Sequence, residues 1–104
     1  MMFERLYFRR DGTPYPPGDA GLWEWCDDFA KEELRIVRQD KLPDGTEIST
    51  IWLGIDHDHH ATMHGLPHLP LMFETMVWGP DGNIALQMRY RSENDAIAGH
   101  MEIV

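Results

Sequence analysis

The chain has little cysteine, no long apolar run and few basic residues. Its one cysteine, Cys26, cannot form an internal disulfide, and a lone thiol is typical of a reducing cytosol. No apolar run approaches the roughly 18 residues that span a bilayer, and the first residues lack the apolar segment of a secretory signal. We therefore expect a cytoplasmic protein without a membrane segment.

Basic residues are also unevenly placed. Nine lysines and arginines stand against 18 acidic residues, which gives a formal net charge of -9. Because this charge repels nucleic-acid phosphates and anionic membrane surfaces, we expect neither as a direct partner. Every lysine and arginine lies within 5–41 or 89–91, so residues 42–88 carry only acids and histidines as charged or titratable groups. The expected partner is a protein with a basic surface.

The length of 104 residues and the hydrophobic content of 42% suit one domain with one core. We expect a single domain over 1–104, with an irregular arm at 1–20, where proline and glycine collect, and a compact core at 21–104. A domain of this size has only about 5 to 10 kcal/mol of net stability, so a partner chain adds a meaningful fraction. A homodimer is therefore one expected arrangement.

Hydrophobic periodicity predicts a short helix near residues 20–31. Its apolar positions recur at i, i+3, i+4 and i+7, as on one face of a helix: Leu22, Trp25, Cys26 and Phe29. Asp19 is the preferred N-cap candidate, because a carboxylate accepts hydrogen bonds from the first free N–H groups. From Leu34 the pattern changes to strands, at 34–40 and 47–56, joined by a Pro-Asp-Gly turn at 43–45.

Two further strands are predicted at 69–78 and 84–90. In the second of these, apolar residues alternate with polar or small ones, which predicts one buried face: Ile84, Leu86, Met88 and Tyr90. A terminal helix follows Ser92, which forms a near capping box with Asp95. The stripe of this helix that is expected to pack on the sheet holds Ile97, Met101 and Val104.

These elements predict an α+β fold. The architecture is an antiparallel β-meander of about four strands, with a short helix near the N-terminal third and a C-terminal helix. Gly99 lies inside the terminal helix and weakens it by about 1 kcal/mol relative to alanine, so this helix needs tertiary support. His100 in the same helix is expected to be packed or capping.

Residues 56–68, DHDHHATMHGLPH, hold five histidines and two aspartates. Imidazole and carboxylate groups are good ligands for zinc or nickel, which gives a candidate metal site: His57, His59, His60 and His64. The thiolates typical of closed structural zinc sites are missing, and Gly65 and Pro67 end any helical turn before His68. The alternative is a polar connecting loop with no cofactor.

Catalytic patterns are incomplete in this sequence. HAT at residues 60–62 matches the H-x-[ST] element that two-histidine phosphoesterases carry twice, but no second copy exists. Ser49 falls within a predicted strand and Cys26 on an apolar helix face, so neither is placed as a nucleophile. We therefore expect no enzymatic activity.

An acidic run covers the end of the first predicted helix and the residues just after it: Asp27, Asp28, Glu32 and Glu33. It is either a solvated helix face or a patch that docks a basic partner. The four tryptophans are expected to be core or interface anchors, with a ligand-stacking surface as the alternative: Trp23, Trp25, Trp52 and Trp78.

Several stretches together resemble a set of small proteins encoded by bacteriophages and prophages. They are STIWLGIDH at 49–57, PLMFETMVWG at 70–79 and RYRSENDAIAGH at 89–100, with LWEWCDDF at 22–29 similar to a segment before the first hairpin. The family has no assigned activity. The polar positions that match its pattern are Asp56, His57, Glu74 and His100, whereas DHHATMHGLPH replaces a glycine-rich stretch of the relatives.

The resemblance implies a phage accessory protein that acts in a bacterial cytoplasm. The functional hypothesis is a non-enzymatic, acidic binding protein that interferes with a host defence complex, in the manner of an anti-CRISPR protein. One alternative is a metal or small-molecule site at the matching polar positions, which would sequester a nucleotide signal. If Glu74 is buried there, His57 or Arg89 is the expected hydrogen-bonding partner. A second alternative is a structural or assembly component of the phage.

Overall fold

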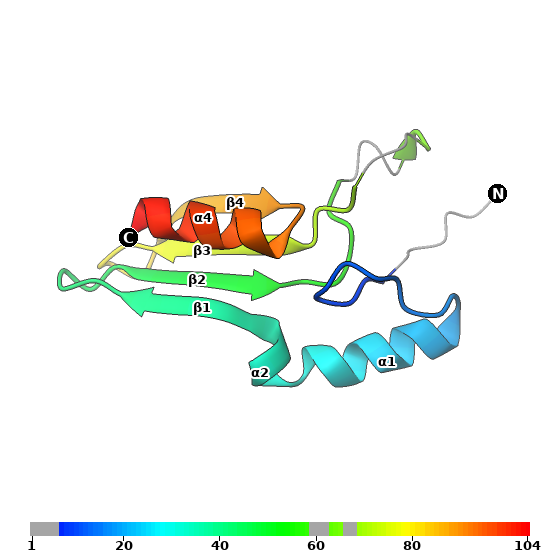
Figure 1. The fold of residues 1–104 in the computed structure, drawn as a ribbon. Helices are drawn as coiled ribbons and strands as arrows, with labels where there is room; N and C mark the ends of the chain where they lie inside the picture. Colours follow the sequence, from blue (N-terminus) through cyan, green and yellow to red (C-terminus); the bar gives the residue numbers. More distant parts are fainter. Residues whose placement is uncertain (1–6, 59–62, 66–68) are drawn as a thin grey trace.

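A computed structural model describes residues 7–58, 63–65 and 69–104. Four strands form one antiparallel sheet in the order β1-β2-β3-β4: Ile36–Lys41, Glu47–Trp52, Phe73–Trp78 and Ile84–Tyr90. Neighbours in sequence are neighbours in the sheet, because tight turns join the first pair and the last pair (Figure 1). The predicted meander is confirmed.

In the part of the chain that the structure describes, three helices accompany the sheet: α1 at Asp19–Phe29, α2 at Glu32–Arg35 and α4 at Glu93–Ile103. Helix α4 packs along one face of the sheet, whereas α1 extends beyond the end of the strands (Figure 1). None of the described helices packs on the opposite face, which we call the open face. Within the described ranges, no helix has the length and apolar character needed to cross a bilayer. The fold is therefore α+β, as predicted.

The strand register assigns the side chains of the two central strands to the two faces. Thr50 is paired with Thr75, and Ile51 is paired with Glu74. Because side chains alternate along a strand, the first pair faces α4 and the second pair faces the open side. The buried side chains of the α4 face are Ile48, Thr50, Trp52, Phe73, Thr75 and Val77. Strand β2 lies between β1 and β3 and buries mainly the face that carries α4.

The apolar core lies where β2 ends and the N-terminal arm crosses the sheet. Its buried members are Tyr15, Trp52, Met72, Phe73 and Ala96. Helix α1 joins through aromatic contacts: the rings of Trp25 and Phe29 stack with centroids 5.0 Å apart, and Trp25 Nε1 donates to the Leu53 carbonyl at 2.9 Å. Tyr15 is only 4% exposed, so the compact unit begins inside the predicted arm.

Several predicted boundaries are wrong. Leu34 lies in the short helix α2 and not in a strand, and β1 begins at Ile36. Strand β2 ends at Trp52, four residues early, because Gly54 has a φ of +74° and breaks the extended run. Asp19 is the first helical residue, and the N-cap is Gly18, which has no side chain to cap the helix. The cap by Ser92 is confirmed, since its side chain accepts from the Asp95 N–H.

The predicted burial of β4 and of the α4 stripe is also wrong. In β4, Ile84, Leu86 and Met88 are 58%, 40% and 44% exposed. Helix α4 buries Ala96 and His100 against the sheet, whereas Met101 and Val104 remain exposed. The cause is position: β4 is an outer strand, and α4 packs mainly on β2 and β3.

Gly99 is needed because α4 approaches Tyr90 closely. A Cβ atom added at Gly99 would lie 2.1 Å from Tyr90 Oη and 2.5 Å from Tyr90 Cζ. The missing side chain therefore allows contact between the helix and β4. The sequence predicted that the terminal helix needs tertiary support because Gly99 weakens it, and this contact with β4 supplies that support.

Gly99→Ala should destabilise the fold, although alanine favours helices. The added methyl overlaps a ring held by a strand, and such overpacking typically costs about 1–3 kcal/mol. Urea unfolding measures the loss. Ala98→Gly at the exposed neighbouring position is the control and should lose about 1 kcal/mol through helix propensity alone. A Gly99→Ala protein more stable than the wild type would contradict the close approach.

Candidate functional site

Asp56 and His57 hold the chain that leads away from β2 against the segment that enters β3. Asp56 Oδ1 accepts from the N–H groups of Asp58 and Leu71, each at 2.9 Å. The His57 N–H donates to the Leu71 carbonyl at 3.0 Å. His57 Nδ1 lies 2.8 Å from the carbonyl oxygen of Ile55, so Nδ1 carries a proton and donates it. These contacts fix the two ends of the histidine-rich segment.

The candidate metal ligands are only partly visible. His57 and His64 are described, whereas His59 and His60 lie outside the described residues. Among the residues that are described, no group of three or more potential ligands could hold a metal ion. The Asp58 carboxylate forms an ion pair with Arg91, with Oδ2 and Nη2 2.8 Å apart. The zinc or nickel site stays a prediction.

Glu74 lies on the open face of the sheet with a side chain only 10% exposed. Its Oε2 accepts from Gln87 Nε2 at 2.8 Å and from Arg89 Nε at 3.1 Å. Arg89 was one of the two partners expected from the sequence, and it is the one that the fold supplies. The two donors come from the adjacent strand β4 and satisfy the buried carboxylate.

His100 is fully buried at the centre of a polar network beneath α4. Its Nδ1 lies 2.7 Å from Thr50 Oγ1, and its Nε2 lies 2.6 Å from Asp40 Oδ2. Thr50 Oγ1 lies 2.5 Å from Thr75 Oγ1, and Arg38 Nε donates to Asp40 Oδ2 at 2.8 Å. A neutral imidazole with its proton on Nε2 satisfies every member: it donates to Asp40 and accepts from Thr50.

The order hydroxyl, imidazole, carboxylate is the order of a hydrolytic triad. The relative exposure of Thr50, Thr75 and His100 is 0%, however, because α4 covers them. A nucleophile must reach a substrate, and the buried Thr50 hydroxyl cannot do so in this arrangement. It ties the terminal helix to two strands, which agrees with the packed histidine expected from the sequence. No sequence pattern indicated Asp40, Thr50 or Thr75 as partners of His100.

The four polar positions of the phage-like pattern do not form one site. Glu74 and His100 lie on opposite faces of the sheet. Asp56 and His57 lie beyond the end of β2. Each position satisfies local hydrogen bonds, so together they stabilise three separate places in the fold.

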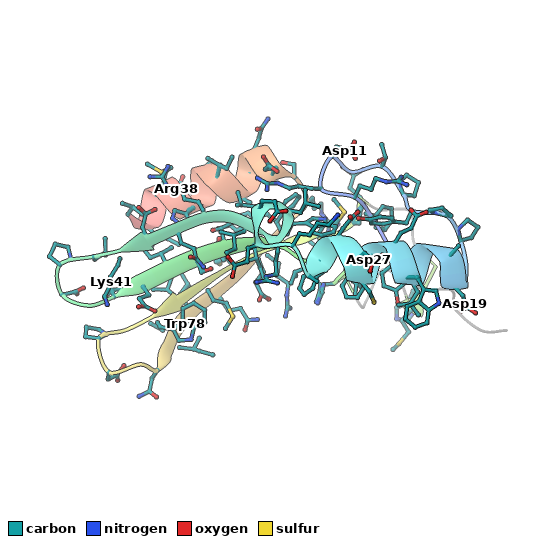
Figure 2. The ribbon with its side chains drawn as sticks, turned by 90° about the horizontal axis from the view of Figure 1, so that it is seen from below. Asp11, Asp19, Asp27, Arg38, Lys41 and Trp78 are labelled. Carbon is teal, nitrogen blue, oxygen red and sulfur yellow. The ribbon has the colours of Figure 1, made fainter. Side chains whose placement is uncertain are left out.

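The acidic run near α1 divides into two parts. Asp27, Glu32 and Glu33 are exposed, and no basic group within the described ranges lies within ion-pair distance of them. We call these three residues the acidic surface. Asp28 is half-buried instead and accepts from Tyr15 Oη at 2.7 Å, with Lys31 Nζ at 3.5 Å. Figure 2 shows Asp27 on α1 and the cations Arg38 and Lys41 far along β1.

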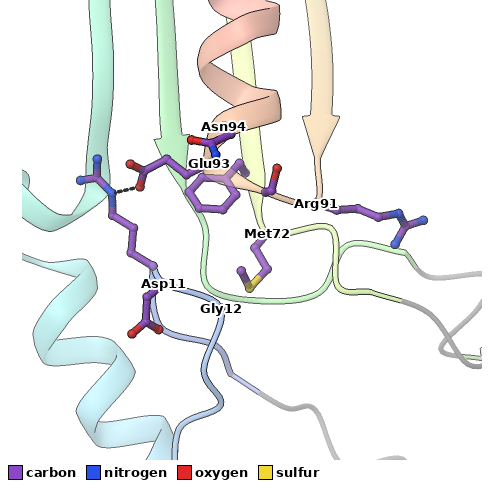
Figure 3. A pocket seen from close by; sticks show the side chains of 9 residues that line it. Asp11, Gly12, Met72, Arg91, Glu93 and Asn94 are labelled. Atoms are coloured by element: carbon purple, nitrogen blue, oxygen red, sulfur yellow. Dashed lines mark hydrogen bonds and ion pairs between the residues drawn. The ribbon is translucent and has the colours of Figure 1, made fainter.

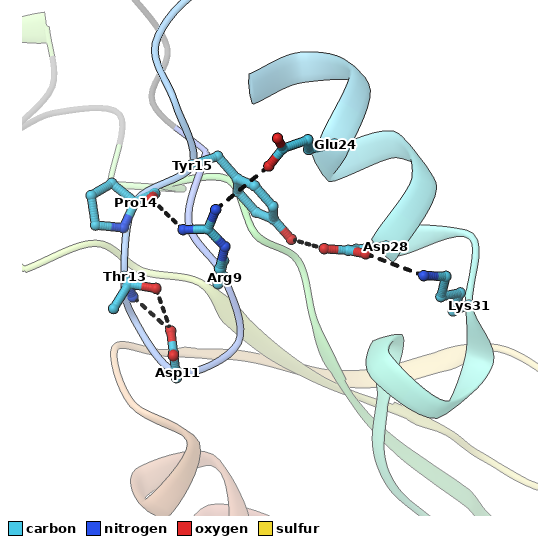
Figure 4. Close-up of polar contacts among 8 residues, drawn as sticks. All are labelled: Arg9, Asp11, Thr13, Pro14, Tyr15, Glu24, Asp28 and Lys31. Atoms are coloured by element: carbon cyan, nitrogen blue, oxygen red, sulfur yellow. Dashed lines mark hydrogen bonds and ion pairs between the residues drawn. The ribbon is translucent and has the colours of Figure 1, made fainter. Parts of the chain in front are cut away.

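The N-terminal arm fixes α1 in place (Figure 4). The Arg9 guanidinium stacks over the ring of Tyr15 at 4.7 Å and donates to the Pro14 carbonyl at 2.7 Å. Arg9 also lies 3.5 Å from Glu24 of α1. Burial, and then the hydrogen bond to Asp28, raise the pKa of Tyr15 well above its usual range, so its phenol stays protonated. Two contacts therefore hold α1 against the arm: Arg9 with Glu24, and Tyr15 with Asp28.

A hollow of about 580 Å³ opens between the arm and the start of α4 (Figure 3). Buried Met72 and Phe73 form its apolar part. Arg10 pairs with Glu93 across it, and the second cation, Arg91, pairs with Asp58. Both guanidinium groups are neutralised within the fold, so the hollow does not indicate a site for a charged ligand.

Thr50→Val tests the buried network at constant side-chain shape. Valine removes the hydroxyl that His100 Nδ1 and Thr75 share, and an unsatisfied buried polar group costs about 1–3 kcal/mol. Urea unfolding at neutral pH measures this loss. Ser49→Ala removes a hydroxyl from the adjacent position on the open face, where its partner Gln39 is exposed, and should change stability by less than about 0.5 kcal/mol. Equal losses in both variants would contradict the network.

Asp40 gives this network a defined pH dependence. The Arg38 guanidinium, and then the His100 imidazole, hold the pKa of Asp40 below its ordinary value of 3.8. A carboxyl whose pKa is lowered in the folded state stabilises the fold above its unfolded pKa, and this stabilisation disappears as pH falls through the folded pKa. The stability difference between wild type and Asp40→Asn should therefore shrink as pH falls from about 6 to about 3. A difference that stays constant over this range would disprove the linkage.

No protein-family model matches the chain, and neither a curated protein nor a solved structure matches it significantly. The resemblance to small phage proteins therefore stays a prediction. A function has to be inferred from the surfaces and contacts described above.

Proposed function

We propose that this protein is a non-enzymatic binding protein whose acidic surface docks on a basic surface of a host protein. The observation that carries the proposal is the unmatched charge of Asp27, Glu32 and Glu33. Some other exposed carboxylates have basic neighbours, as Glu24 has Arg9 and Glu47 has Lys41. The acidic surface is thus available to an external cation.

Unmatched exposed carboxylates suit a transient or steered interface. They are well solvated in the free protein, so exposing them costs little, and each forms a charge-assisted hydrogen bond when an arginine or lysine approaches. The net charge of -9 adds long-range attraction toward a basic partner and speeds association. The aromatic contacts of Trp25 and Phe29 hold α1 rigid, which limits the ordering that binding requires.

The resemblance to phage-encoded proteins supplies the setting of the proposal. Such a protein meets host complexes in a bacterial cytoplasm, and complexes that bind nucleic acid carry arginine and lysine where phosphates normally lie. Carboxylates placed on that surface exclude the nucleic acid by competing for the same cations. A defence nuclease is the host target that this chemistry fits best.

The buried network also favours binding over catalysis. The hydroxyl, imidazole and carboxylate groups that resemble a triad are covered by α4, and their hydrogen bonds satisfy one another. Their best-supported role is to stabilise the scaffold that presents the acidic surface.

The test is capture of host proteins from bacterial lysate by the wild-type chain and by Glu32→Gln/Glu33→Gln. The identified partner is then titrated against both proteins at rising salt. Each exposed pair is worth about 0.2–1 kcal/mol, so the loss of two pairs should weaken binding by about twofold to about thirtyfold. Wild-type binding should weaken as salt screens the charges.

Asp95→Asn/Glu102→Gln is the matched control. It removes two exposed acids of α4, so the net charge changes equally while the acidic surface stays intact. Its affinity should remain close to wild type. Binding that is insensitive to salt, or that both double variants weaken equally, would reject docking through the acidic surface.

A further inference from the structure

Strand β4 is an outer strand of the sheet with exposed apolar side chains. It runs for seven residues, Ile84–Tyr90, and only β3 pairs with it in the described chain. Leu86 is paired with Val77 and Met88 with Thr75, so both lie on the face that carries α4. They are nevertheless 40% and 44% exposed. Of the face that alternation predicted to be buried, Leu86 and Met88 are thus left largely uncovered within the described residues.

The opposite edge of the sheet is built differently. Strand β1 carries Arg38, Asp40 and Lys41, and its register shifts between Ile36 and Arg38. Charged side chains and bulges are the usual means by which proteins prevent an outer strand from pairing with another chain. In β4 the only charged residue is Arg89, which Glu74 of the neighbouring strand neutralises. The pairing of β4 with β3 also shifts, between Val77 and Trp78, but this irregularity lies at the Ile84 end of β4 and leaves residues 86–90 regularly paired. That regular, nearly uncharged part of β4 is the edge suited to pairing with another strand.

We propose that β4 pairs in antiparallel orientation with β4 of a second copy of this chain, which joins the two sheets into one. A two-fold axis at Gln87 places Leu86 opposite Met88 of the partner subunit and forms a shared apolar cluster on the α4 face. Each Arg89 lies two residues from this axis, so the two Arg89 side chains are not opposed. The unpaired N–H and C=O groups of both strands then bond to each other.

The sequence of β4 fits a second copy because Leu86 and Met88 are complementary to each other about Gln87, and the local charge of this edge permits that contact. Two chains of net charge -9 repel each other, so they associate only where the local surface is neutral, as it is along β4. A basic protein is drawn instead to the acidic surface of α1 and α2. Because salt screens the overall repulsion, rising salt should tighten the dimer, opposite to its effect on the proposed host complex.

The test compares Leu86→Lys and Met88→Lys with a matched control, Met101→Lys. Met101 is 46% exposed, but it lies on the far flank of α4: His100 faces the sheet and Gly99 faces Tyr90 of β4. All three variants change the net charge equally. Analytical ultracentrifugation at about 100 µM protein should give wild type and Met101→Lys twice the chain mass of 12.1 kDa. The two β4 variants should dissociate at least about tenfold more readily.

Hydrogen exchange of the wild-type chain is a second measurement that requires no substitution. The β4 amides that point away from β3 should be protected at high protein concentration and lose that protection on dilution, whereas the edge amides of β1 should not change. A wild-type chain that is monomeric at all concentrations would overturn the proposal. So would a dimer that Met101→Lys disrupts and the β4 variants leave intact, or β4 amides whose exchange is independent of concentration.

Discussion

One helix covers a sheet that is wider than the helix, and this mismatch shapes the rest of the molecule. An α-helix with its side chains is about 10 Å across, whereas strands lie about 4.8 Å apart, so a single helix covers about two strands. Helix α4 packs mainly on β2 and β3. The two outer strands are left at the margins, and α1 extends beyond the sheet to close the core at one end (Figure 1).

The mismatch gives the covered strands an unusual polar centre. Beneath α4, Thr50 and Thr75 face each other across β2 and β3, and His100 descends on them from the helix. A purely apolar contact would have been less specific, whereas hydroxyl and imidazole groups are satisfied only when they meet at hydrogen-bonding distance. The network therefore fixes the position of α4 along the strands, and the close contact of Gly99 with Tyr90 fixes its distance from β4.

The same mismatch separates two surfaces of different character. At the α1 end, helices that are not needed to cover the sheet carry carboxylates into solvent, with Tyr15 and Asp28 holding the helix in place. At the β4 margin, exposed apolar side chains and a neutral strand edge remain. A charged surface and a neutral edge attract different partners, so a second copy and a basic host protein need not compete for one surface.

The sequence by itself determined the local elements. Ser92 predicted its own role as a cap, and alternation gave the bounds of β4 correctly, because caps and strand periodicity depend on neighbouring residues alone. It also predicted His100 to be packed or capping, and it named Arg89 as one of two candidate partners of Glu74. The C-terminal end of β2 was predicted wrongly because the residues around Gly54 do not indicate its left-handed conformation.

Only the tertiary structure decided which faces are covered. The alternating pattern of a strand is the same whether the strand lies at the centre or at the edge of a sheet. The exposure of Leu86 and Met88 therefore depends on strand order. The partners of His100, Asp40 and Thr50, are 60 and 50 residues away in sequence, and the fold alone brings them within hydrogen-bonding distance. Short-range chemistry is encoded residue by residue, whereas burial and long-range pairing are properties of the assembled chain.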